Sequence, residues 1–309
     1  MKSEIRKDYI QDKYVIIAPK RNKRPHDLER PERVRPDKRT SCIFCPEKLE
    51  KNNTIIASTS LKKNEKWSVA VIDNKYPAVS LDNSKAYGKQ EVVIETPHHI
   101  KELDDLSLSH IAAIFEIYAQ RTKIISEIKK IEYILIFKNN GGTAGASIEH
   151  AHSQIFATSF LPPHLLDKSQ KVQENKLKNG TCVYCDVIKK ESRSPRLIYK
   201  DEHVTAFTPY ASMFNYESWI MPNRHIDNIT LLTSQERISF AKILKKILKK
   251  INKLALPYNF YFHQVIHDED QHLYLKIVPR GSVRAGVEVG SGIIINPISP
   301  EDAAKYFRK

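Results

Sequence analysis

The sequence predicts an α+β fold made of two similar halves in tandem, and three observations lead to this prediction. A C-x-x-C pair, a strand that ends in proline and histidine, and an amphipathic helix each occur twice, in the same order. The two copies begin at Cys42 and Cys182, about 140 residues apart. Repetition of whole supersecondary units at one spacing is typical of a duplicated domain.

The composition is that of a globular protein. The chain has 309 residues, of which 41% are hydrophobic and 28% charged, so neither a disordered chain nor a small disulfide-stapled domain is expected. No apolar run reaches the roughly 18 residues that a membrane helix needs, and residues 1–8 lack the apolar core of a secretory signal. We therefore expect a cytoplasmic protein with no membrane partner.

The formal net charge of +14 favours anionic partners such as nucleic acid, acidic lipid or phosphorylated small molecules. A lysine-rich, solvated surface explains the same charge equally well. The lysines of segment 234–254, for example, could bind a polyanion or simply face water. Charge alone selects no function.

Local sequence patterns predict the elements of the first half. Prolines and charges within the first forty residues argue against a packed helix and predict an extended arm or loop. Short β-branched runs predict strands, and apolar residues at helical spacing predict an amphipathic helix. The expected elements are strands at 67–72 and 91–95, a helix within 107–131, a strand at 133–137, a glycine-rich loop at 139–147 and a strand at 150–157.

The second half repeats this outline after a polar linker with some helix at 161–180. The repeat and the linker predict an N-terminal half over residues 1–165 and a C-terminal half over residues 175–309, each with its own cysteine pair. The expected elements of the second half are strands at 204–210 and 218–225, a basic amphipathic helix at 234–254, and closing strands at 259–262 and 272–279.

All four cysteines belong to the two C-x-x-C pairs. In a reducing compartment such pairs are typical of metal sites or redox centres, and no second redox feature follows either pair. Structural zinc is the favoured interpretation, with two thiolates and two imidazoles in each half. His98 is the alternative to His99. The expected ligands are Cys42, Cys45, His99 and His150 in the first half, and Cys182, Cys185, His225 and His272 in the second.

A zinc-containing nucleic-acid-binding protein is the alternative of another class, because it would combine the cysteine pairs with the positive charge. The two knuckles of a zinc ribbon usually lie about 15–20 residues apart. Cys45 and Cys182 stand far apart in this chain, which argues against a single ribbon. One metal ion shared by all four cysteines would support this alternative.

A glycine-rich loop and the strand after it carry the strongest catalytic signal. Small residues within 141–145 let backbone N–H groups approach an anion closely, and Ser147 can donate a further hydrogen bond. His150, His152 and Gln154 follow at alternate positions, so on a strand they lie on one face. A neutral imidazole is a good nucleophile toward phosphorus and a fair leaving group from it, as covalent nucleotidyl transfer requires.

Together these motifs resemble the galactose-1-phosphate uridylyltransferase family of the histidine triad superfamily, whose members have two histidine-triad-like halves. The resemblance extends over nearly the whole chain, and it implies tandem α+β halves, each an antiparallel sheet with packed helices. It rests on Asn139 to Gln154, Arg21-x-x-Arg24-Pro25, Cys42-x-x-Cys45, Asn74-x-Tyr76-Pro77, Thr96-Pro97-His98-His99, Pro222-x-x-His225, 272–280 and 300–304.

The resemblance also implies an activity. His152 would form a nucleotidyl-histidine intermediate, and Gln154 and Ser147 would bind the transferred phosphoryl group. In a ping-pong reaction UDP-glucose would yield glucose 1-phosphate, and galactose 1-phosphate would then take the uridylyl group. The cofactor would be Zn²⁺, one or two per chain, and the protein would be a homodimer with a shared pocket. The substrate-binding residues would be Arg21, Arg24, Asn74, Asn139 and Gly145.

Several features depart from the best-known members of the family. Ala151 stands where they have proline between the two histidines, and Tyr274 stands where they have a ligand of a second metal site. The second cysteine pair, with His225 and His272, instead resembles a two-zinc branch that includes ADP-glucose phosphorylases. The segment 290–297 also resembles this branch and lacks a glutamine that helps to hold the hexose phosphate. Adenylyl transfer to inorganic phosphate is therefore the alternative to uridylyl transfer.

Overall fold

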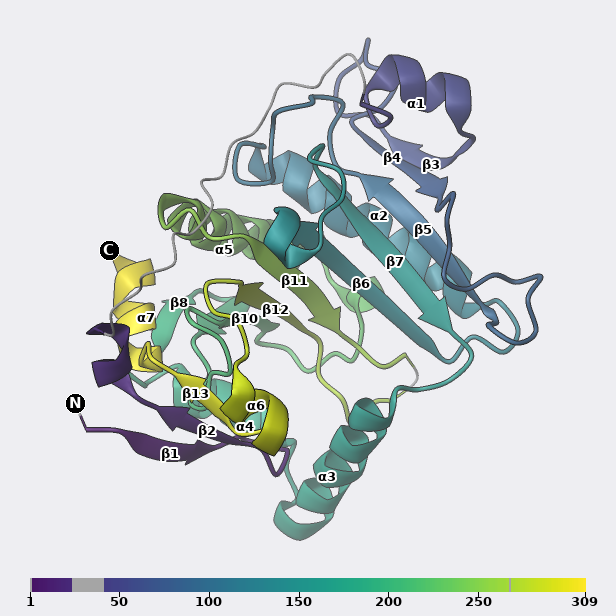
Figure 1. Ribbon diagram of the computed structural model, residues 1–309. Coiled ribbons are helices and arrows are strands. Elements are labelled where there is room, and N and C mark those ends of the chain that lie inside the picture. The colour runs from purple at the N-terminus through teal and green to yellow at the C-terminus, as the bar shows by residue number, and fades with distance from the viewer. Residues whose placement is uncertain (1, 24–41, 267) are drawn as a thin grey trace.

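A computed structural model describes residues 2–23, 42–266 and 268–309 (Figure 1). A ten-stranded sheet has the order β3-β4-β5-β7-β6-β11-β12-β10-β9-β8, with every neighbouring pair antiparallel. Read inward from the two edges, the strands of both halves come in the same order and meet where β6 pairs with β11. The strands are β3 (Ile55–Thr59), β4 (Val69–Asp73), β5 (Gly88–Ile94), β6 (Tyr133–Asn140), β7 (His152–Thr158), β8 (Leu197–Lys200), β9 (Val204–Phe207), β10 (Ser218–Pro222), β11 (Tyr258–His263) and β12 (Tyr274–Pro279).

Two long helices cover one face of this sheet and contact each other, as Figure 1 shows: α2 (Leu108–Ser126) and α5 (Ser234–Lys253). The Ser107 side chain caps α2, and Thr233 forms a capping box with Glu236 at the start of α5. Alternate residues of the central strands join the two helices in the main hydrophobic core. The other residues of those strands therefore lie on the opposite face.

That opposite face is covered near its outer strands by two shorter helices, each directly associated with a cysteine pair. α1 (Pro46–Asn52) follows the first pair and packs on β4 and β5 through Leu49, beside Phe44 of the cysteine pair. α4 (Val183–Glu191) contains Cys185 and packs on β9 and β10 through Tyr184. Between these two covered areas the middle of the face remains open for a site.

The beginning of the chain differs from the predicted extended arm. β1 (Glu4–Lys7) and β2 (Tyr14–Ile17) pair antiparallel, and β2 also pairs in parallel with β13 (Ile294–Asn296). Val15 and Ile17 are fully buried, and Arg6 forms an ion pair with Glu301 at 3.0 Å. The partners of this segment, β13 and Glu301, lie near the other end of the chain. Local sequence patterns therefore did not reveal these contacts.

The linker also differs from its prediction, because α3 (Pro163–Asn179) is one continuous helix that Gly180 ends in a left-handed conformation. Near the C-terminus follow α6 (Gly286–Ser291) and α7 (Pro300–Arg308). In the part of the chain described, no helix is long and apolar enough to cross a membrane. The division at residues 165–175 stays a prediction.

Candidate active site

His152 begins β7, between β5 and β6 in the middle of the open face. Its side chain is buried, with 7% of its surface exposed, and its Nδ1–H donates to the carbonyl of His150 at 2.8 Å. This hydrogen bond selects the tautomer whose lone pair is on Nε2. Burial, reinforced by the positive charge of Lys138, lowers the pKa of His152 to about 4. At neutral pH the imidazole is therefore uncharged and nucleophilic.

The glycine-rich loop forms one wall of a cavity of about 660 Å³ that His152 also lines. Gly141 and Gly145 have φ of +89° and +88°, a conformation that favours glycine. A Cβ on Gly141 would also lie 3.0 Å from Pro257. Ser147 lines the same cavity. The predicted anion-binding loop and the predicted nucleophile are thus brought together, with room for a phosphorylated ligand.

The other predicted binding residues lie in different places. Gln154 Oε1 accepts hydrogen bonds from Gln90 Nε2 at 2.9 Å and from Asn74 Nδ2 at 3.4 Å, so Asn74 and Gln154 meet across β5. Asn139 lines the cavity and accepts a hydrogen bond from Asn259 at 2.8 Å. Arg21 belongs to the turn Pro19–Lys23 beside the small sheet and does not line the cavity. Arg24 lies outside the described residues.

A buried ionic network that the sequence analysis did not find holds the start of β7. Lys138 Nζ is 2.6 Å from Glu95 Oε2 and 3.3 Å from Glu102 Oε2, and it also donates to the His152 carbonyl at 3.1 Å. Burial alone would lower the pKa of Lys138, but the carboxylates of Glu102 and Glu95 overcome this and raise it. The nearest sequence signal is the lysine itself, which directly follows the apolar run 133–137.

Replacing Lys138 with methionine is expected to lower the free energy of unfolding by about 3–5 kcal/mol, because it leaves Glu95 and Glu102 buried without their cation. Urea unfolding at pH 7 measures this loss. Lys123→Met, at an exposed position of α2, is the matched control and should change stability by less than about 0.5 kcal/mol. A loss below 1 kcal/mol for Lys138→Met would mean that Glu95 and Glu102 do not become uncompensated buried charges when the lysine is removed.

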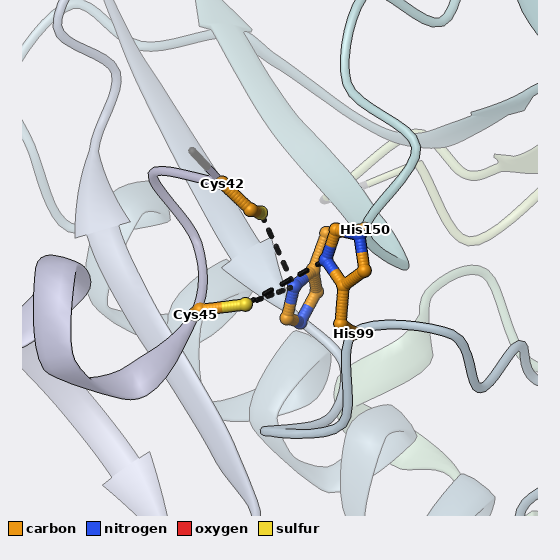
Figure 2. A group of neighbouring side chains, drawn as sticks. All are labelled: Cys42, Cys45, His99 and His150. Carbon is orange, nitrogen blue, oxygen red and sulfur yellow. Dashed lines mark hydrogen bonds between the residues drawn. The ribbon is translucent and has the colours of Figure 1, made fainter. Parts of the chain in front are cut away.

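Four candidate metal ligands surround one point beside this site. Cys42 and Cys45 precede α1, His99 follows β5, and His150 precedes β7; Figure 2 shows the four side chains converging. Their ligand atoms all lie within 4.8 Å of one another. The Sγ of Cys42 is 3.5 Å from Nδ1 of His150, and the Sγ of Cys45 is 3.6 Å from Nδ1 of His99.

These separations fit a tetrahedral ion. Bonds of about 2.3 Å to sulfur and 2.1 Å to nitrogen, at a tetrahedral angle, place the two ligand atoms about 3.6 Å apart. His150 Nε2–H donates to the carbonyl of Thr96 at 2.7 Å, which leaves Nδ1 unprotonated toward the thiolates. His99 rather than its neighbour His98 joins the group, so these are the four residues that the sequence analysis named, and their role as metal ligands stays a prediction.

Comparison with known proteins identifies the family. Residues 1–162 match the family described as "Galactose-1-phosphate uridyl transferase, N-terminal domain". The chain is 32% identical to an ADP-glucose phosphorylase of Arabidopsis thaliana, over 99% of this chain and 92% of the relative. It is 30% identical to a galactose-1-phosphate uridylyltransferase of Thermotoga maritima, over 99% and 98% respectively. The chain belongs to the galactose-1-phosphate uridylyltransferase family.

Solved structures of this family confirm the predicted fold class, tandem histidine-triad-like α+β halves. An ADP-glucose phosphorylase from Arabidopsis thaliana with bound ADP-glucose superposes with a TM-score of 0.87 and 31% identity, over 100% of this chain and 99% of the other. A uridylyltransferase structure gives a TM-score of 0.75 at 27% identity, over 99% and 97%. The chain is thus a nucleotidyltransferase of the galactose-1-phosphate uridylyltransferase family.

The second half of this family member contains a separate group of candidate ligands. Ligand atoms of Cys182, Cys185 and His225 lie within 4.8 Å of one another. A hydrogen bond from the Cys185 thiol lowers the pKa of Cys182 to about 6, so this thiolate is available near neutral pH. Since the two cysteine pairs belong to different groups, the described residues do not form the single shared site of the nucleic-acid-binding alternative.

His272 stands just outside this second group. Its Nδ1–H donates to the carbonyl of Leu273 at 2.9 Å, and its buried Nε2 has no hydrogen-bond partner among the described residues. Its ring centre lies 5.1 Å from that of His225. A buried nitrogen with a lone pair beside the group is what a fourth ligand would supply, so His272 stays a predicted ligand.

Proposed function

We propose that the protein transfers a nucleoside monophosphate from a nucleotide sugar to an acceptor through a covalent intermediate on His152. One observation carries the proposal: a neutral imidazole, with its lone pair on Nε2, lines the same cavity as the glycine-rich loop. Membership of the family and the relative crystallised with ADP-glucose support this class of substrate.

In the first step, the Nε2 lone pair of His152 attacks the α-phosphorus of the donor. The bond from that phosphorus to the bridging oxygen breaks, and sugar 1-phosphate leaves with the electron pair. The Nδ1 proton stays on the ring and its bond to the His150 carbonyl stabilises the positive charge that the ring acquires. In the second step an acceptor oxygen attacks phosphorus, and the N–P bond breaks to return the lone pair to Nε2.

The predicted substrate contacts belong to this proposal. Ser147 and the loop N–H groups would bind the transferred phosphoryl oxygens, since they line the cavity with His152. Gln154 would join them by donating through Nε2, while its Oε1 keeps the hydrogen bond that it accepts from Gln90. Asn74 and Asn139 would contact the nucleotide, together with Gly145, and Arg21 and Arg24 would contact a phosphate.

Zinc is the metal that the donor sets favour, because two thiolates and imidazoles in a tetrahedral arrangement are its typical structural ligands. In the first site Cys42, Cys45, His99 and His150 would complete its coordination and leave no position for substrate or water. The ion would supply rigidity by fixing His150, whose carbonyl orients His152. We propose a second structural site at Cys182, Cys185 and His225, with His272 as the fourth ligand.

Uridylyl transfer from UDP-glucose to a hexose 1-phosphate is the first candidate reaction, supported by the matching family and by the Thermotoga maritima relative. Adenylyl transfer from ADP-glucose to inorganic phosphate is the second, supported by the Arabidopsis thaliana relative and its structure with bound ADP-glucose. Both use the same nucleophile and differ in the base and the acceptor. We also propose that the protein is cytoplasmic and forms a homodimer. Light scattering of the pure protein tests the dimer.

Intact-protein mass spectrometry after incubation with UDP-glucose or, separately, ADP-glucose tests the proposal. The protein is kept at neutral to alkaline pH so that a phosphoramidate survives. A uridylyl adduct that galactose 1-phosphate removes supports the first candidate, and an adenylyl adduct that phosphate removes supports the second. No adduct from either donor in zinc-loaded protein would overturn covalent transfer.

A further inference from the structure

A second cavity, of about 570 Å³, opens on the same face of the sheet as the active-site cavity but toward the C-terminal half. β11 and β12 contribute Tyr261, Tyr274 and Lys276 to its wall, and α3 contributes Lys168. Asn139 and Arg280 line both cavities. A volume of this size suits a small-molecule ligand.

The strand registers make this cavity the counterpart of the active site. On β7, Gln154 pairs with Val92 and Phe137 of the flanking strands. On β12, Lys276 pairs in the same way with Trp219 and Tyr261.

β12 is the equivalent of β7 in the strand order, and His272 stands four residues before Lys276 as His150 stands four residues before Gln154. Lys276 therefore occupies the position of Gln154, and Tyr274, two residues earlier, occupies that of the nucleophile His152. The aromatic residues inside the two C-x-x-C motifs support this correspondence. Phe44 contacts His152 and Tyr184 contacts Tyr274, with ring centres 5.2 and 6.0 Å apart. A tyrosine has no ring nitrogen, so it does not replace a neutral imidazole as the nucleophile that forms an N–P bond. The counterpart can bind a ligand but lacks the group that forms a phosphoramidate.

Lys168 is an unusual feature of this wall. It is 8% exposed, it forms no ion pair with the described residues, and its Nζ donates to the Tyr274 hydroxyl at 2.5 Å. Asp8 and Glu217 attract it without such contact. Its charge lies over the rings of Tyr274 and Trp219, 5.1 and 5.9 Å from their centres. Burial lowers its pKa to about 7. A buried cation without a paired carboxylate lowers the stability of the unliganded fold. An anion bound in the cavity would offset this cost.

The remainder of the cavity agrees with an anionic, flat ligand. Lys276 is neutralised by Glu217 at 2.7 Å, so it adds little net charge. Aromatic rings form a large part of the wall, and the Trp219 and Tyr274 rings stack 4.4 Å apart. Apart from Lys276, four of the described lining residues are lysine or arginine and one is a carboxylate: Lys13, Lys168, Arg280 and Arg284 against Asp8.

We propose that this cavity is a nucleotide-binding site that holds a nucleoside monophosphate without transferring it. The phosphate is placed at Lys168, and the base against the aromatic wall of the cavity. Because Asn139 and Arg280 are shared with the active-site cavity, an occupant here contacts residues that also face the substrate. The proposal does not depend on which donor the active site uses, nor on His152 acting as the nucleophile.

Equilibrium dialysis of the full-length protein with AMP and, separately, UMP tests the site. His152→Ala protein is used so that no covalent adduct forms. We expect two nucleotides per chain in this background, and one after Lys168→Met is added. Lys178→Met, at an exposed position of the same helix, is the matched control and should leave two. Equal binding in the Lys168→Met and Lys178→Met proteins would overturn the proposal.

Fluorescence locates the ligand independently. Trp219 lines the cavity, whereas the other tryptophan, Trp67, belongs to the separate cluster beside α1. AMP should change the emission of a Trp67→Phe protein, and Lys168→Met should weaken this response at least tenfold in apparent Kd. Inorganic phosphate and glucose 1-phosphate serve as further probes. Equal or tighter binding of glucose 1-phosphate would contradict a site for the base.

Folding of Lys168→Met is checked by its melting temperature, which should rise at pH 7 because a costly buried cation is removed. If Lys168→Met does not fold, Lys168→Gln takes its place in both measurements. An unchanged response to AMP in a folded variant of either kind would overturn the role of Lys168. A Lys168→Met protein that retains His152 should still form the covalent adduct. This result would separate the second cavity from the proposed catalysis.

Discussion

Replacement of His152 by alanine is expected to abolish the covalent adduct and to lower the rate of nucleotidyl transfer by on the order of 10⁶-fold, as loss of a covalent nucleophile does. The only other imidazole of the motif, His150, is turned away by its bond to the Thr96 carbonyl and faces the cysteine pair through Nδ1. It cannot take over the attack. Mass spectrometry and a steady-state exchange assay measure the two losses.

His203→Ala is the control for this variant, because His203 lies in the turn between β8 and β9, away from the active-site cavity. It should keep the wild-type rate. His152→Ala should keep its metal content and its cooperative unfolding, since His152 does not belong to the metal-ligand group. A nucleotidyl adduct that persists in folded His152→Ala protein would rule out His152 as the nucleophile.

Loss of the first metal site is expected to have the largest effect on stability. Binding of a structural zinc ion contributes about 10–16 kcal/mol in small zinc domains. That is as large as the whole unfolding free energy of a typical protein, about 5–15 kcal/mol. Cys42→Ser, or treatment with a strong chelator, should therefore remove cooperative thermal unfolding of the first half and, with it, adduct formation at His152.

Elemental analysis and calorimetry on the same samples measure this effect. Cys182→Ser is the comparison: it should lose one ion per chain while retaining the first site, which the structure forms from other residues. We expect two ions per chain in the wild type. Unchanged metal content and melting temperature in Cys42→Ser would show that the four side chains of Figure 2 do not hold a metal.

The amino-acid sequence was sufficient for features whose residues lie close together along the chain or recur in order. The cysteine pairs, the glycine-rich loop and the run from His150 to Gln154 are local patterns, and each depends on strand alternation or on chemical type. Their repetition also predicted the tandem halves. α2 and α5 begin within two residues of their predicted starts, because the spacing of apolar residues along a helix is a local pattern.

Only the tertiary structure decided which distant residues share an environment. The partners of Lys138 are Glu95 and Glu102, and β2 pairs with β13 from near the other end of the chain. Likewise, Lys168 is an ordinary helical lysine in sequence, and it becomes a buried cation only because α3 packs beside Tyr274. Burial and ion pairing depend on contacts between separate elements, which local periodicity does not encode.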